Sequence, residues 1–121
     1  MRHLVKHTGL GRSGSHKATM LRNLATSLFD SGQISTTLGR AKALRPYVER
    51  LITIAKKNEN VTAIRALSGV LYTDTSIKKC LEYATTFKSR NGGYLRIVKN
   101  GFRFGDSAPV GVVQFVESDQ A

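Results

Sequence analysis

Residues 20–44 read MLRNLATSLFDSGQISTTLGRAKAL, and this stretch decides the fold because it contains a helix, a strand and the start of a second helix. A strand is predicted at residues 33–37, which are rich in β-branched side chains, and Thr37 can cap the helix after it. The preceding helix is predicted to begin at an N-cap, Ser15, and to end at Gly32. Its apolar positions recur at the spacing of one helix face: Leu21, Leu24, Ala25, Leu28 and Phe29.

Three further helices follow from the same kind of periodicity. Helical spacing runs through residues 38–57 on both sides of Pro46, which predicts one helix with a bend at the proline. Two shorter helices come next, and their predicted N-caps are Asn60 and either Thr73 or Asp74.

The chain closes with two segments of strand composition, residues 94–99 and residues 110–116. Asn100-Gly101 is a turn signal, so the two strands are expected to pair as a hairpin. The order helix, strand, three helices, two strands predicts an α+β fold with its helices packed on one face of a small sheet. A mixed sheet is expected if the strand of Ile34 joins an edge of the hairpin.

A chain of 121 residues and 13.3 kDa fits one domain. We expect residues 1–15 to form an extended basic arm, residues 16–117 a single α+β domain, and residues 118–121 a frayed tail. The one cysteine, Cys80, lies in the apolar row of its helix, which predicts a buried structural thiol and excludes an internal disulfide.

Basic residues dominate the charge: 19 Lys and Arg stand against 8 Asp and Glu, which gives a net charge of +11. The first 24 residues contain no acid, and neither does the stretch 88–105, which holds five basic residues. In a folded domain such an imbalance indicates a phosphate backbone as partner. We expect the two tracts to form one composite surface.

The residues expected to contact this partner are cations, hydrogen-bond donors and glycines that let the backbone approach phosphates closely. Tyr94 has two interpretations, stacking on an unpaired base or ordinary strand packing. The absence of a helix-turn-helix, zinc-finger or RNP signature favours folded RNA over a DNA groove. The predicted RNA-binding residues are Arg2, His3, Lys6, His7, Arg12, Ser15, His16, Lys17, Arg22, Asn23, Thr36, Thr37, Arg40, Lys42, Arg45, Arg90, Asn91, Gly92, Gly93, Tyr94, Arg96, Lys99 and Arg103.

Three motifs that superficially indicate other chemistry fail on context. Residues 9–14 match G-x-G-x-x-G, but no buried strand precedes them. The three histidines lie in a cationic stretch with no nearby cysteine or carboxylate, which disfavours zinc. Gly105-Asp106-Ser107 resembles an esterase block, but no histidine follows it. No catalytic residue, metal or cofactor is therefore expected; a DNA-binding or nucleoid-type protein is the first alternative, and a small enzyme is a distant one.

Several blocks of the sequence belong together: Met1-Arg2-His3; Ser15-His16-Lys17 with residues 20–28; residues 34–37 with Ala41-Lys42 and Leu44-Arg45; Arg90-Asn91-Gly92-Gly93-Tyr94 with Arg96-Ile97; and Gly105-Asp106-Ser107-Ala108. In this order they resemble the bacterial-type large-subunit ribosomal protein seventeen family. The resemblance implies an α+β domain with an extended N-terminal arm, bound to large-subunit ribosomal RNA near the rim of the exit tunnel. It also implies large-subunit proteins thirty-two and twenty-two as neighbours. No apolar run approaches the length of a membrane span, so no membrane partner is expected, and no small-molecule substrate is expected either. The expected location is a cytoplasmic rather than an organellar ribosome. Although the acid-free N-terminus alone is compatible with a transit peptide, Met1-Arg2-His3 matches the mature start of the family.

Overall fold

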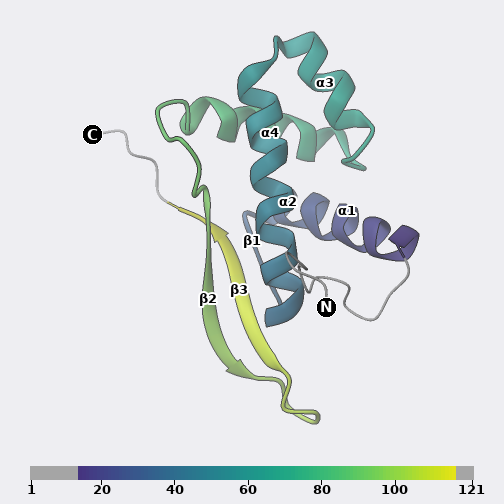
Figure 1. Ribbon diagram of the computed structural model, residues 1–121, viewed down its shortest axis with the longest axis vertical. Helices are drawn as coiled ribbons and strands as arrows, with labels where there is room; N and C mark the ends of the chain where they lie inside the picture. The colour runs from purple at the N-terminus through teal and green to yellow at the C-terminus, as the bar shows by residue number, and fades with distance from the viewer. Residues whose placement is uncertain (1–13, 117–121) are drawn as a thin grey trace, which may run out of the picture.

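The computed structural model describes residues 14–116, which form four helices and a three-stranded sheet (Figure 1). The elements follow the predicted order of helix, strand, three helices and two strands, so the α+β class is confirmed. Within the described residues no helix is long and apolar enough to cross a membrane. In chain order the elements are α1 (Gly14–Ser31), β1 (Gln33–Thr37), α2 (Leu38–Lys57), α3 (Asn60–Ser68), α4 (Asp74–Thr86), β2 (Leu95–Phe102) and β3 (Pro109–Phe115).

The sheet has the strand order β1-β3-β2, and both of its pairings are antiparallel. The predicted hairpin of β2 and β3 and the edge position of β1 are confirmed, but the expected mixed sheet is wrong. After β2, the turn reverses the chain, and β3 then runs opposite to both of its neighbours. In the register, Val113 of β3 lies opposite Ile34 on one side and Ile97 on the other.

One face of this sheet is covered by helices, as predicted. The long helix α2 contacts all three strands, and α1 contacts β1. Pro46 lies inside α2 without dividing it, so the prediction of one helix over 38–57 is confirmed. The helices α3 and α4 pack against α2, and the turn end of the β2–β3 hairpin extends beyond the helices (Figure 1).

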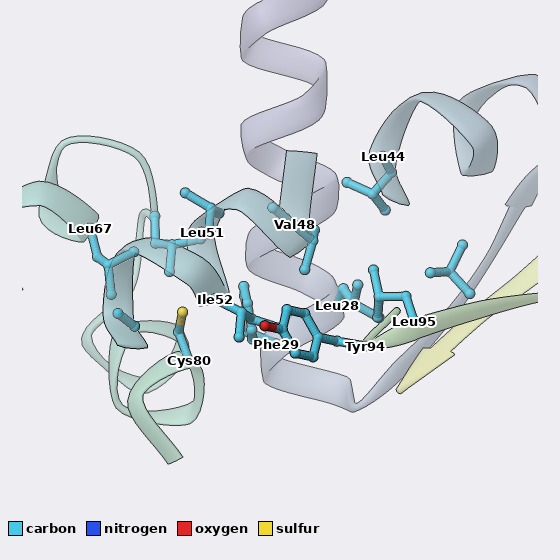
Figure 2. Close-up of a cluster of buried hydrophobic side chains, with 14 of the residues drawn as sticks. Leu28, Phe29, Leu44, Val48, Leu51, Ile52, Leu67, Cys80, Tyr94 and Leu95 are labelled. Atoms are coloured by element: carbon cyan, nitrogen blue, oxygen red, sulfur yellow. The ribbon is translucent and has the colours of Figure 1, made fainter. Parts of the chain in front are cut away.

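The core lies where α1, α2, α4 and the sheet meet (Figure 2). Phe29, Leu44, Ile52 and Val113 are fully buried there. Cys80 is also fully buried, which confirms the structural thiol, and burial raises the pKa of this thiol to about 12.

Local signals placed most helix ends correctly. Gly32 ends α1 with φ of +86°, a backbone conformation that favours glycine, and its N–H donates to the carbonyl of Leu28 at 2.7 Å. Thr73 caps α4 as predicted, because its hydroxyl accepts from the N–H of Ser76. At α3 the N-cap is Glu59 rather than Asn60.

Two boundaries differ from the sequence predictions. The helix α1 includes Gly14 and Ser15, whereas the sequence predicts that the arm runs to residue 15 and that Ser15 is the N-cap. Asn100-Gly101 is not the hairpin turn: β2 runs on to Phe102, and the pairing register shifts between Lys99 and Phe102. Gly101, with φ of +78°, lies within this bulge-like irregularity. The turn of the hairpin is formed by residues 103–108 instead.

Candidate nucleic-acid interface

Four of the predicted RNA-binding residues line one cleft, which we call the β1–α2 cleft. They are Thr36 and Thr37 at the end of β1, Arg40 in the first turn of α2, and Arg103 from the turn of the hairpin. Ser35 and Val110 complete the lining, and the cleft has a volume of about 360 Å³. Residues more than 60 positions apart in sequence, Arg40 and Arg103, thus share one concave surface.

The chemistry of the β1–α2 cleft suits an anion. The first turn of α2 contains no acidic residue, and Thr37 at the N-cap makes no side-chain hydrogen bond to it. Backbone N–H groups and the positive end of the helix dipole favour negative charge at such a position. Arg40 supplies positive charge to the cleft, and Arg103, which is paired with Asp106, and three hydroxyl side chains add hydrogen-bond donors for a phosphate.

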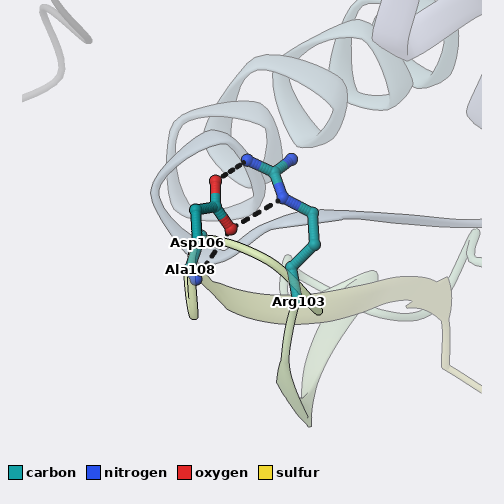
Figure 3. A network of polar contacts seen from close by, with 3 residues as sticks. All are labelled: Arg103, Asp106 and Ala108. Carbon is teal, nitrogen blue, oxygen red and sulfur yellow. Dashed lines mark hydrogen bonds and ion pairs between the residues drawn. The ribbon is translucent and has the colours of Figure 1, made fainter.

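Arg103 is fixed by an ion pair inside the hairpin turn (Figure 3). Its Nε donates to Asp106 Oδ1 at 3.2 Å, and its Nη2 donates to Asp106 Oδ2. The same carboxylate accepts from the N–H of Ala108 at 3.1 Å. These hydrogen bonds, from Arg103 first and Ala108 second, lower the pKa of Asp106 to about 2.

The lowered pKa of Asp106 makes the shape of the turn insensitive to pH across the neutral and mildly acidic range. Because the folded state favours the carboxylate, its stabilising effect is complete above the ordinary value of 3.8 and is lost only as the pH falls towards about 2. We expect the carboxyl carbon of Asp106, followed by NMR, to titrate with a midpoint near the lower value. A midpoint at the ordinary value would show that the ion pair does not form in solution.

Arg96 lies on the sheet face opposite the helices and is exposed, as an RNA contact requires. With its amide oriented to satisfy both neighbours, Gln114 accepts from Arg96 Nε at 2.7 Å and donates to Gln33 Oε1 at 3.1 Å. This row crosses all three strands, so it holds the Arg96 guanidinium on the open face of the sheet.

The basic loop 88–93 is anchored by a residue that the sequence analysis did not select. Lys56 of α2 donates to the carbonyl of Arg90 at 2.6 Å and to the hydroxyl of Tyr94 at 2.9 Å. Lys56 and Lys88 also line a second cleft, of about 350 Å³, between the C-terminal ends of α2 and α4. No pattern in the sequence distinguishes Lys56 from the other cations of α2, because its partners come from the loop.

Tyr94 is a correction to the predicted interface. Only 2% of the residue is exposed, its ring lies 5.2 Å from that of Phe87, and its hydroxyl is bound by Lys56. A base cannot stack on a buried ring. The interpretation as strand packing is therefore the correct one.

Arg22 also turns towards the protein rather than towards solvent. Its Nε donates to the carbonyl of Val70 at 2.9 Å, and its guanidinium lies 4.4 Å from the centre of the Tyr72 ring. Arg22 thereby ties α1 to the segment before α4. Thr26 of the same helix is buried and accepts from the N–H of Tyr72.

The other predicted residues are not gathered into the β1–α2 cleft. Lys42 and Arg45 are exposed on α2, and Arg45 Nε lies 4.0 Å from Glu49 Oε2. Lys99 lines a small apolar hollow with Phe102 and Pro109 instead. The helix α1 carries Ser15, His16, Lys17 and Asn23, and the basic loop carries Asn91, Gly92 and Gly93. Five further predicted residues lie outside the described part of the chain: Arg2, His3, Lys6, His7 and Arg12. The composite surface of the two basic tracts therefore remains a prediction.

The comparisons with known proteins agree on one family. The family model of ribosomal protein L17 matches residues 20–116. The large ribosomal subunit protein bL17 of Allorhizobium ampelinum is 46% identical over 98% of this chain and 84% of its own length. The bL17 proteins of Ehrlichia chaffeensis (46% identical, 97% of this chain, 91% of the relative) and Neorickettsia sennetsu (39%, 96% and 100%) are similar over nearly the whole chain. With an α+β fold, a net charge of +11 and matches of this extent, the chain belongs to the ribosomal protein L17 family, which is a family of ribosomal proteins rather than of enzymes.

Proposed function

We propose that this protein is a structural constituent of the large ribosomal subunit, where it binds and braces large-subunit ribosomal RNA. The observation that carries the proposal is the β1–α2 cleft, in which Arg40 and Arg103 meet three hydroxyl side chains at the start of a helix. Phosphate is the ligand that this set of groups suits. Membership of the family supports the assignment, because the relatives are named as large ribosomal subunit proteins.

The binding surface has three parts on the described chain and one beyond it. The β1–α2 cleft, the open sheet face at Arg96 and the loop 88–93 supply cations from separate elements. The N-terminal segment adds Arg2, Lys6 and Arg12 as an extended arm, with the α+β domain as its platform. Ribosomal RNA offers a continuous phosphate surface for all four.

Its place in the ribosome follows from the same assignment. The protein sits near the rim of the exit tunnel of cytoplasmic ribosomes, with large-subunit proteins thirty-two and twenty-two among its neighbours. It acts by neutralising phosphate charge and holding RNA segments in a fixed arrangement, and it needs no cofactor for this.

Sedimentation of the tagged protein with ribosomal subunits tests the proposal directly. We expect the protein in the large-subunit peak of a gradient, and we expect protein-free large-subunit RNA to outcompete duplex DNA for the purified chain. Sedimentation with the small subunit, or preferential binding of the duplex, would contradict the assignment, and the second result would favour the DNA-binding alternative.

A further inference from the structure

The turn of the β2–β3 hairpin presents two phenylalanines to solvent. Phe104 is fully exposed and Phe102 is 74% exposed, and they flank Arg103. The turn of the hairpin extends beyond the helices (Figure 1), although Phe102 still borders a small hollow with Leu38, the first residue of α2. We call residues 102–108 the hairpin tip.

The hairpin tip is an ordered turn. The N–H of Arg103 donates to the carbonyl of Ala108 at 2.7 Å, and the N–H of Ser107 donates to the carbonyl of Arg103 at 3.0 Å. The side chains of Arg103 and Asp106 add an ion pair across the same turn (Figure 3). Phe104 is therefore held in an exposed position before any partner arrives, which reduces the entropy cost of using its ring in binding.

The size of the aromatic surface indicates what it fits. Two phenylalanine rings can bury on the order of 300–500 Å², whereas a stable protein interface needs about 800 Å² from each partner. Arg103, Asp106 and Ser107 of the tip are exposed and polar or charged, and the apolar surface next to Phe102 is a small hollow lined by Leu38, Pro109 and Val110. An unpaired base needs only one exposed ring, and cations close to that ring add phosphate contacts.

The position of the tip indicates where that base would come from. Arg103 belongs both to the hairpin tip and to the lining of the β1–α2 cleft, so the two sites are continuous. We propose that Phe104, assisted by Phe102, stacks on unpaired bases of the ribosomal RNA whose phosphates occupy the β1–α2 cleft. This inference rests on the proposed function, and it adds a class of contact that the charge pattern alone does not predict.

Stacking and phosphate binding differ in their response to salt. A phosphate contact releases counterions, so its loss lowers the slope of log affinity against log salt, whereas stacking releases none. Removing the Phe104 ring should weaken binding at every salt concentration and leave the slope unchanged. Arg40→Gln should instead reduce the slope by about one.

The test measures binding of the full chain to protein-free large-subunit ribosomal RNA over a series of salt concentrations. We expect Phe104→Ala to weaken binding by roughly 5- to 100-fold with an unchanged slope, and Phe104→Tyr to bind as the wild type does. Phe104→Leu separates stacking from general apolar contact, because leucine has no π face; it should weaken binding as alanine does. Thermal unfolding of all three variants should match the wild type, since the ring is exposed.

If Phe104→Ala or Phe104→Leu binds the RNA with wild-type affinity, the stacking proposal is overturned. The proposed function stays intact in that case as long as the wild-type chain binds with a steep salt dependence. Binding of the wild-type chain that is weak and independent of salt would instead count against the proposed function itself. The two failures are thus distinguishable in one set of titrations.

Discussion

Raising the salt concentration from about 50 to about 200 mM should lower the affinity of this protein for large-subunit ribosomal RNA by roughly 10³- to 10⁵-fold, if roughly six to ten phosphates are contacted. The β1–α2 cleft, the sheet face and the loop 88–93 supply five cations, and Arg2, Lys6 and Arg12 of the N-terminal segment bring the number to eight, which lies within that range. Each phosphate that is neutralised releases condensed counterions, and added salt opposes this release. A filter-binding or fluorescence titration at several salt concentrations measures the slope.

A variant that lacks residues 1–13 provides the matched comparison. It loses Arg2, Lys6 and Arg12, so its slope should be smaller by about two to three if each of them contacts a phosphate. Its thermal unfolding should stay close to that of the full chain, because the core cluster of the described residues extends from Leu21 to Val113. A flat titration of the full chain would contradict RNA binding through phosphates, and an unchanged slope in the shortened chain would remove the arm from the interface.

Phe29→Ala should lower the free energy of unfolding by about 3–5 kcal/mol, the range observed for large-to-small changes in packed cores. Phe29 is fully buried in α1, and its ring centre lies 5.5 Å from that of Phe115 and 6.2 Å from that of Tyr83. Removing it leaves a cavity between α1, α4 and β3. Since domains of this kind are stable by roughly 5–15 kcal/mol in total, this loss is a large fraction of the stability.

Urea unfolding followed by circular dichroism measures the change, and Phe104→Ala is the matched control. It makes the same chemical substitution at a fully exposed site, so its free energy of unfolding should remain within about 0.5 kcal/mol of the wild type. Similar losses in the two variants would mean that the packing around Phe29 is not the main support of α1 on the sheet.

The interface was predictable only in part, and its residues show why. The cations Arg40, Arg96 and Arg103 were found from charge, and the structure places them on exposed or cleft-lining positions. Tyrosine and arginine are residue types that often contact RNA, but here Tyr94 accepts a hydrogen bond from Lys56 and Arg22 donates one to the carbonyl of Val70. Phe104 was not selected, although the alternation Phe-Arg-Phe in a stretch poor in acids was visible.

By itself, the sequence determined the class of fold, the positions of the four helices, the burial of Cys80 and the strongly basic character of the surface. These properties depend on residues a few positions apart or on composition, so periodicity and charge are enough to establish them. Only the tertiary structure decided the antiparallel direction of β1 against β3, the place of the hairpin turn and the inward orientation of Tyr94 and Arg22. Each of these depends on partners from distant parts of the chain; Arg22, for example, binds a carbonyl 48 residues away. An amphipathic side chain such as tyrosine or arginine can face either way, and the packing of those distant partners decides which.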